Sequence, residues 1–101
     1  MDHPPSDAIA GTILDDAVEL TLEEVSLVCA VREERILALV DEGVLQPRGR
    51  ERGDWRFPGA TVARAARALR LQRELDVDAH AAAVILELLD EIDRLRARLA
   101  R

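Results

Sequence analysis

The stretch LTLEEVSLVCAVREERILALVDEGVLQPRGRERGDWRF, residues 20–57, decides the fold. It opens with Thr21 and carries Glu24 three positions later, a capping-box pattern that predicts a helix over Leu22–Cys29. After a short break, a second helix is predicted over Arg32–Glu42, and the glycine that follows suits the left-handed conformation that ends many helices. Two short helices joined by a tight break form a helix-turn-helix.

Each of these two helices has one apolar face, because its apolar residues recur at spacings of three and four. In the first helix these residues are Leu22, Val25, Val28 and Cys29, and in the second they are Ile36, Leu37, Leu39 and Val40. Cys29 is therefore expected to be a buried thiol with a structural role.

The residues after the second helix are expected to form a small wing. Val44–Pro47 is predicted to be extended, residues 48–54 form a polar turn, and Trp55–Phe57 returns as a strand. We expect a β-hairpin whose two aromatic rings pack on the helices, the alternative being an aromatic hot spot at an interface. Residues 17–20 are either a short strand or coil.

A longer helix is predicted over Gly59–Leu75, with Pro58 in its first turn. Its apolar side comprises Val62, Ala65, Ala66 and Leu69, and Leu71 and Leu75 extend that side. Four arginines recur at every third position, so we expect them to wind around the outer surface and pair with acids of this chain or of a partner. They are Arg64, Arg67, Arg70 and Arg73.

The last helix is predicted over Ala79–Leu89, with Asp78 as its N-cap, and a heptad pattern continues from there. The spacing of this pattern alternates between three and four, as in the seam of a coiled coil. Its members are Ile85, Leu88, Ile92, Leu95 and Leu99. Because the pattern covers only about two heptads, it is either an intramolecular core helix or the interface of a homodimer.

The 101 residues, with a formal net charge of −6, are expected to form one small domain with an appended helix. We expect a flexible leader over residues 1–16, a winged helix-turn-helix domain over 17–77 and a dimerisation helix over 78–101. The fold class is therefore mainly α, with a short β wing. Residues 1–30 hold seven acids and no base, which counts against a general nucleic-acid binder.

Several function classes are not expected from this composition. No apolar run approaches the roughly 20 residues of a membrane span, and no signal peptide is apparent. The single cysteine fits a reducing cytoplasm. Cys29, His3 and His80 are too few and too far apart for a metal site, and no phosphate loop or nucleophile motif occurs. We therefore expect no enzyme, no cofactor and no small-molecule substrate.

Glu33 and Glu34 lie side by side at the start of the helix that would read DNA. The phosphates of a duplex attract Arg and Lys and repel carboxylates, so this helix argues against DNA. The alternative is that these charges are only solvated. We interpret the acids of the two helices, taken together as a cluster, as a binding surface for a basic protein partner. The candidate residues are Glu23, Glu24, Glu33, Glu34, Asp41 and Glu42.

The order of these motifs resembles a known family. Residues 22–25, 43–47, 55–57 and 70–75, followed by the run LLDEIDRL at 88–95, are similar to the MerR-type winged helix. They resemble the chaperone modulator family, CbpM, more closely, over roughly residues 17–101. No single motif is specific, but their order and spacing are.

The resemblance implies a function and a partner. Proteins of the CbpM family bind the J-domain of the co-chaperone CbpA in bacteria, inhibit it and lower its DNA binding. A J-domain contacts its chaperone through a basic helix and a His-Pro-Asp loop, so a protein that masks that surface should be acidic. The resemblance also implies a homodimer in the bacterial cytoplasm that reaches the nucleoid through its partner.

The competing hypothesis is a MerR-type DNA-binding regulator. The wing would then contact phosphates through Arg48, Arg50, Arg52 and Arg56, unless these arginines belong to a solvated turn. True MerR regulators usually carry Arg and Tyr along the recognition helix and continue into an effector domain. The paired glutamates and the end of the sequence at Arg101 depart from that pattern. A third hypothesis is a small dimerisation module with another protein partner.

Overall fold

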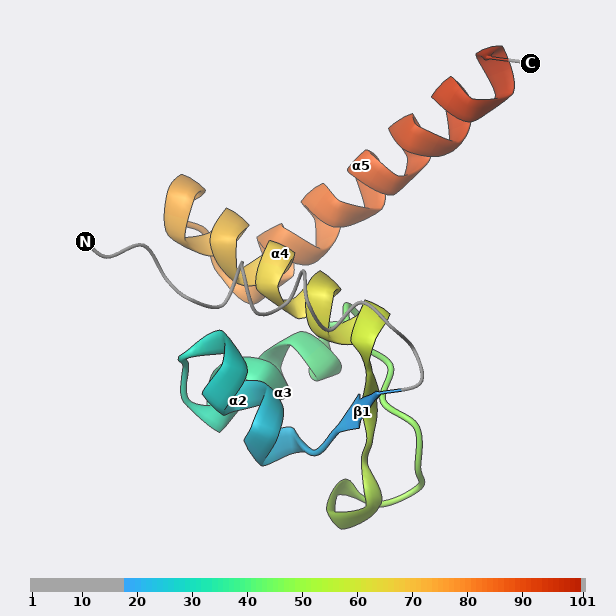
Figure 1. Ribbon diagram of the computed structural model, residues 1–101. Helices are drawn as coiled ribbons and strands as arrows, with labels where there is room; N and C mark the ends of the chain where they lie inside the picture. The colour runs from blue at the N-terminus through green and yellow to red at the C-terminus, as the bar shows by residue number, and fades with distance from the viewer. Residues whose placement is uncertain (1–17, 101) are drawn as a thin grey trace.

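The computed structural model describes residues 18–100 and shows a mainly helical winged helix-turn-helix, as the sequence predicts (Figure 1). The elements in chain order are β1 (Glu19–Leu20), α2 (Leu22–Cys29), α3 (Glu33–Asp41), a 3-10 turn (Arg52–Asp54), β2 (Phe57–Pro58), α4 (Gly59–Leu75) and α5 (Ala79–Leu99). The predicted leader over residues 1–16 lies outside the described part of the chain.

The helix-turn-helix begins with the predicted capping box. The backbone N–H of Glu24 donates to Thr21 Oγ1 at 3.1 Å, and the N–H of Thr21 donates to the Glu24 carboxylate at 2.9 Å. Helix α2 ends where Ala30 adopts a left-handed conformation, with φ of 59°. Residues other than glycine seldom adopt this left-handed backbone conformation. Ala30 adopts it nevertheless, and the chain turns sharply there between α2 and α3.

Helix α3 is one residue shorter at each end than predicted, because Arg32 and Glu42 are its cap residues. Gly43 then takes the expected left-handed conformation, with φ of 78°. The backbone N–H of Val44 donates back to the Leu39 carbonyl at 2.9 Å, which directs the chain into the wing.

The two arms of the predicted β-hairpin pair with each other at a single position. Within the wing, only Arg48 and Arg56 form a bridge, through two backbone hydrogen bonds of 2.9 Å each. Strand β2 pairs instead with β1 in an antiparallel register that places Leu20 opposite Phe57. Of the two alternatives for residues 17–20, the short strand is therefore the correct one, at Glu19–Leu20, and its partner is the returning arm of the wing rather than the arm at 44–47.

The two aromatic rings anchor this returning arm, as predicted. Phe57 is fully buried, Trp55 is half-buried, and their rings meet edge to face with centroids 6.2 Å apart. Pro58 is the N-cap of α4 rather than a residue of its first turn.

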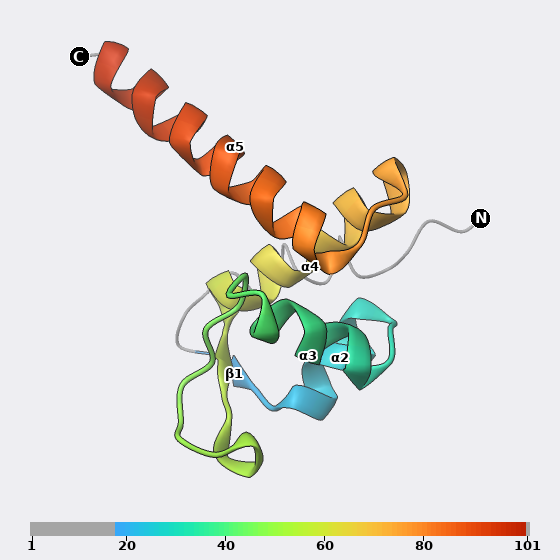
Figure 2. The same cartoon turned by 180° about the vertical axis from the view of Figure 1, so that it is seen from behind.

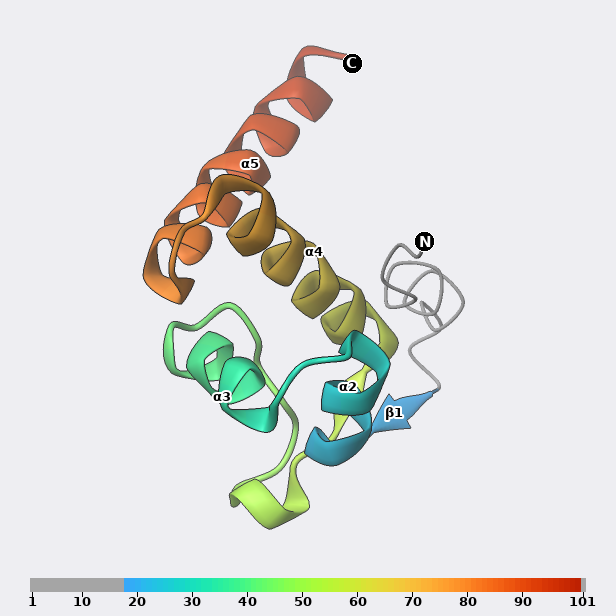
Figure 3. The same ribbon diagram turned by 90° about the vertical axis from the view of Figure 1, so that its left-hand side faces the viewer.

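Helix α4 is the central element of the core. It contacts both strands, α2, α3 and α5, and Figure 3 shows α2 and α3 on one side of it and α5 on the other. Its predicted apolar residues are buried, with two exceptions: Leu71 is half-buried and Leu75 is 53% exposed. Leu75 lies in the last turn of α4, just before Asp76 ends the helix in a left-handed conformation.

Helix α5 is one continuous helix that includes the whole heptad pattern. Asp78 caps it as predicted, accepting a 2.8 Å hydrogen bond from the N–H of Ala81. Ala82 and Leu86 are its buried residues, whereas residues 91–100 are all exposed. Figures 1 and 2 show this carboxyl-terminal half projecting away from the rest of the fold.

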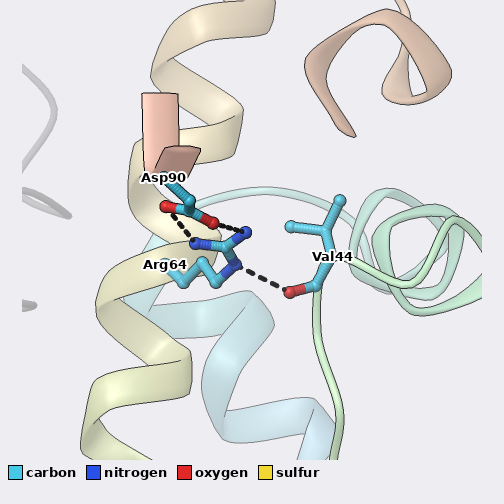
Figure 4. A network of polar contacts seen from close by, with 3 residues as sticks. All are labelled: Val44, Arg64 and Asp90. Carbon is cyan, nitrogen blue, oxygen red and sulfur yellow. Dashed lines mark hydrogen bonds and ion pairs between the residues drawn. The ribbon is translucent and has the colours of Figure 1, made fainter. Parts of the chain in front are cut away.

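Arg64 of α4 connects three segments of the chain (Figure 4). Its Nε donates to the Val44 carbonyl at 3.0 Å, while Nη2 and Nη1 lie 2.9 and 3.4 Å from the two carboxylate oxygens of Asp90. The expected position of Arg64 on the outer surface is therefore wrong, because its half-buried side chain holds the start of the wing and α5 against α4. The expected pairing with an acid of the same chain is confirmed for this arginine.

Replacing Arg64 with methionine keeps most of the side-chain volume and removes all three contacts. We expect Arg64→Met to lower the free energy of unfolding by about 1–2 kcal/mol, since a hydrogen bond to a charged group contributes a few kcal/mol at most and this one is partly screened by solvent. Urea denaturation followed by circular dichroism measures the change. The matched control is Arg67→Met, which removes a half-buried arginine of the same helix whose side chain makes no hydrogen bond within residues 18–100. An equal loss in both variants would show that the contacts of Arg64 add nothing specific.

Candidate protein-binding surfaces

The paired glutamates lie in the first turn of α3 and are exposed. Ile36 and Leu39 are fully buried and define the inner side of this helix. At about 100° per residue, Glu34 and Asp41 fall on the opposite, outer side, separated by about 10 Å along the axis. Carboxylates at the start of a helix are also stabilised by its dipole.

The six predicted acids do not form one continuous face. Glu23 and Glu24 lie in the first turn of α2, where Glu24 folds back to cap its own helix. Glu42 follows α3 at its other end and contacts His80 of α5. Glu33, Glu34 and Asp41 are therefore the acids of α3, and none of them forms an ion pair within residues 18–100. These three residues, named here the α3 carboxylates, are the strongest part of the predicted surface.

The Glu42–His80 contact joins the end of α3 to the first turn of α5. His80 Nδ1 lies 3.0 Å from Glu42 Oε1. The hydrogen bond and the charge of Glu42 raise the pKa of His80 above its usual value, and the charge of Asp78 adds to the effect. No sequence pattern predicts this pair, because the two residues are 38 positions apart and belong to different helices.

Two of the four wing arginines are engaged within the fold. Arg48 forms an ion pair with Glu19 of β1, and Arg56 Nη1 donates to the Trp55 carbonyl at 2.8 Å. Arg50 and Arg52 are exposed near the tip of the wing. A phosphate-binding wing would thus rely mainly on these two residues.

The apolar seam of α5 is largely uncovered. Ile92 is 42% exposed and Leu95 43%, Leu88 and Leu99 are more exposed at 60% and 85%, and Ile85 is half-buried at the base of the seam. An exposed apolar stripe of this kind is typical of a surface that another chain covers. Of the two alternatives for the seam, an intramolecular core is therefore wrong from Leu88 onward.

Residues 18–100 offer neither a metal site nor a membrane-spanning helix. No group of three His, Cys, Asp or Glu side chains in residues 18–100 lies close enough to hold a metal ion. Within the same range, every helix is too short or too polar to cross a membrane.

Comparison with known proteins identifies the family. The MerR HTH family of regulatory proteins matches residues 20–101. The chaperone modulatory protein CbpM of Coxiella burnetii is 31% identical over 91 residues, which cover 90% of this chain and 86% of the relative. The CbpM protein of Salmonella newport is 39% identical over 79 residues, or 78% of each chain.

The chain belongs to the CbpM family. The resemblance predicted from the motif order is therefore confirmed, as is the MerR-like fold class. The CbpM relatives are named as chaperone modulatory proteins, and the matching family is described as regulatory. Neither description names an enzyme.

The Glu42–His80 pair leads to a prediction about pH. Because the pKa of His80 is raised in the folded state, the contribution of the pair to stability is fully present below the unfolded pKa and is lost as the pH rises through the folded pKa. We expect Glu42→Gln to move the pKa of His80 down toward its ordinary value of about 6.5. An NMR titration of the His80 ring measures the shift. The control is Glu74→Gln on α4, which should leave the titration unchanged, and an unchanged pKa in Glu42→Gln would contradict the contact.

Proposed function

We propose that this protein binds the J-domain of a CbpA-type co-chaperone and inhibits both its co-chaperone activity and its DNA binding. Membership of the CbpM family supports modulation of a chaperone system. The observation that carries the choice of surface is the exposure of the α3 carboxylates (Glu33, Glu34 and Asp41). They offer negative charge to a basic surface such as the one through which a J-domain contacts its chaperone.

The proposed mechanism is steric masking guided by charge. The side of α3 away from the core meets the basic helix of the J-domain, so the chaperone and the inhibitor compete for one surface. Complementary charge raises the association rate and sets the orientation more than it raises the affinity. Binding of this kind weakens with salt, since exposed charges are screened over about 10 Å at 0.1 M ionic strength.

DNA binding is the less favoured function for this helix. A duplex carries one negative charge for about every 1.7 Å of its axis, so an inserted helix would bring Glu34 and Asp41 against phosphates. The wing offers Arg50 and Arg52 as exposed cations, while Arg48 and Arg56 have partners within the fold. A gel-shift titration with duplex DNA tests this alternative.

We also propose that two copies associate through α5. The exposed seam supplies the apolar contact, and the charges beside it are segregated along the helix. Acids occupy the first part, at Glu87, Asp90, Glu91 and Asp93, and arginines the second, at Arg94, Arg96 and Arg98. An antiparallel pair would place acids opposite arginines. Two heptads alone make a weak interface, so α4 must contribute to it.

Reversing the two leading carboxylates tests the J-domain proposal. We expect calorimetry at low ionic strength to show binding of a purified CbpA-type J-domain by micromolar protein. Because Glu33→Arg with Glu34→Arg places cations against a basic surface, it should weaken that binding at least tenfold and remove most of its salt dependence. The matched control, Glu51→Arg with Glu74→Arg, changes the net charge equally at exposed sites away from α3 and α5.

Two outcomes would count against different parts of this proposal. Absence of binding by the unaltered protein would exclude the partner. Unchanged affinity and salt dependence in the reversed variant would exclude the surface while leaving the partner intact. A steeply salt-dependent gel shift without J-domain binding would favour the DNA-binding regulator instead.

A single charge in the seam tests self-association. We expect Ile92→Arg to shift the sedimentation coefficient from that of a dimer to that of a monomer, because it would bury a cation in an apolar interface. The side chain is 42% exposed within one chain, so the substitution leaves the fold of the monomer unaffected. Ala97→Arg adds the same charge off the seam and should stay dimeric. Identical sedimentation of both variants would rule out this interface.

A further inference from the structure

Two adjoining hollows surround the turn between α2 and α3. Their volumes are about 590 Å³ and 560 Å³, and both are lined by Ala30, Val31 and Arg35. The first extends to the last turns of α4, and the second opens along the end of α2. Together they form a continuous surface, named here the turn groove, whose main residues are Leu27, Ala30, Val31, Arg35, Gln72 and Arg73.

The α2 side of the turn groove is apolar. Leu27 is 72% exposed although it lies between buried residues of α2, and Val31 is half-buried beside it. The wall of the first hollow includes Leu69, a residue of the core. A ligand that covers Leu27 and Val31 therefore removes apolar surface from water, which favours binding by about 25 cal/mol for each Å² covered.

The rim of the turn groove is basic. Arg32 and Arg35 line it from the start of α3 and Arg73 lines it from the end of α4, against a single acid, Asp76. Arg35 lies about 100° around α3 from Glu34, so the groove and the α3 carboxylates occupy different sides of the helix. Arginine presents a planar fork of donors that matches a carboxylate.

We propose that the turn groove binds a short acidic peptide segment of a partner protein. An apolar side chain of the segment packs on Leu27 and Val31, and its carboxylates pair with Arg35 and Arg73. This inference is independent of the J-domain proposal, because it uses another side of α3 and a ligand of opposite charge.

A nucleic acid is the other anion that the arginines would attract, and the groove suits it less well. A phosphodiester backbone gains nothing from the apolar surface at Leu27. It would also extend past the groove toward Glu33 and Glu34, which repel it. A peptide of a few residues stays within the groove.

The test uses the full chain and the fluorescein-labelled hexapeptide Asp-Asp-Leu-Leu-Asp-Glu. We expect its fluorescence polarisation to rise with protein concentration at low ionic strength. The isosteric neutral peptide Asn-Asn-Leu-Leu-Asn-Gln should bind at least tenfold more weakly. Arg35→Glu and Arg73→Glu should each weaken binding of the acidic peptide at least tenfold, whereas Arg50→Glu, an equal change of charge on the wing, should leave it unchanged.

Leu27→Asp is a second variant at an exposed position and should weaken binding to a similar extent without affecting the fold. The proposal is overturned if the acidic peptide does not bind, if the neutral peptide binds equally, or if Arg35→Glu and Leu27→Asp both bind like the unaltered protein. Displacement of the peptide by duplex DNA, with loss of DNA binding in Arg35→Glu, would also overturn it in favour of a nucleic-acid site. J-domain binding that persists in Arg35→Glu would show that the two surfaces act separately.

Discussion

The contacts of Arg64 set the geometry on which the rest of the structure depends. One guanidinium reaches the start of the wing through Val44 and the middle of α5 through Asp90. One side chain of α4 therefore helps to hold both the wing and α5 in their orientations relative to α4. This network adds a polar link between the segment that follows α3 and α5, beside the apolar core that packs the helices together (Figure 4).

Helix α3 separates charges of opposite sign by its helical geometry. Its outer side carries Glu34 and Asp41, while Arg35 faces the turn groove. The net charge of the helix does not reveal that these acids and Arg35 lie on different sides of it. The order of charged residues along the sequence does not reveal it directly either. Two partners of opposite charge can thus be accommodated by a helix of 9 residues without sharing a side of it.

Much of the fold could be predicted from the sequence, because its determinants are local. The capping box at Thr21, the glycine after α3 and the cap at Asp78 act within four residues, and the apolar spacing shows which sides of the helices are buried. What could not be predicted depends on residues far apart in the chain. The pairing of Leu20 with Phe57, the direction of Arg64 and the Glu42–His80 contact leave no periodic pattern. The candidate acidic surface could not be predicted in full for the same reason. Glu24 caps its own helix, Glu42 contacts His80 of another helix, and the α3 carboxylates are the acids left on an open surface.

The projecting half of α5 has a consequence for how the protein responds to dilution. Residues 91–100 are exposed and are supported by local interactions such as the Glu91–Arg94 pair. An isolated helical segment of this length is only marginally stable in water, so its order is linked by mass action to whatever covers its apolar stripe. Under the association of two copies proposed above, this segment would be the first to fray when dilution separates the copies. The reach of the molecule beyond its core domain would then vary with its abundance in the cell.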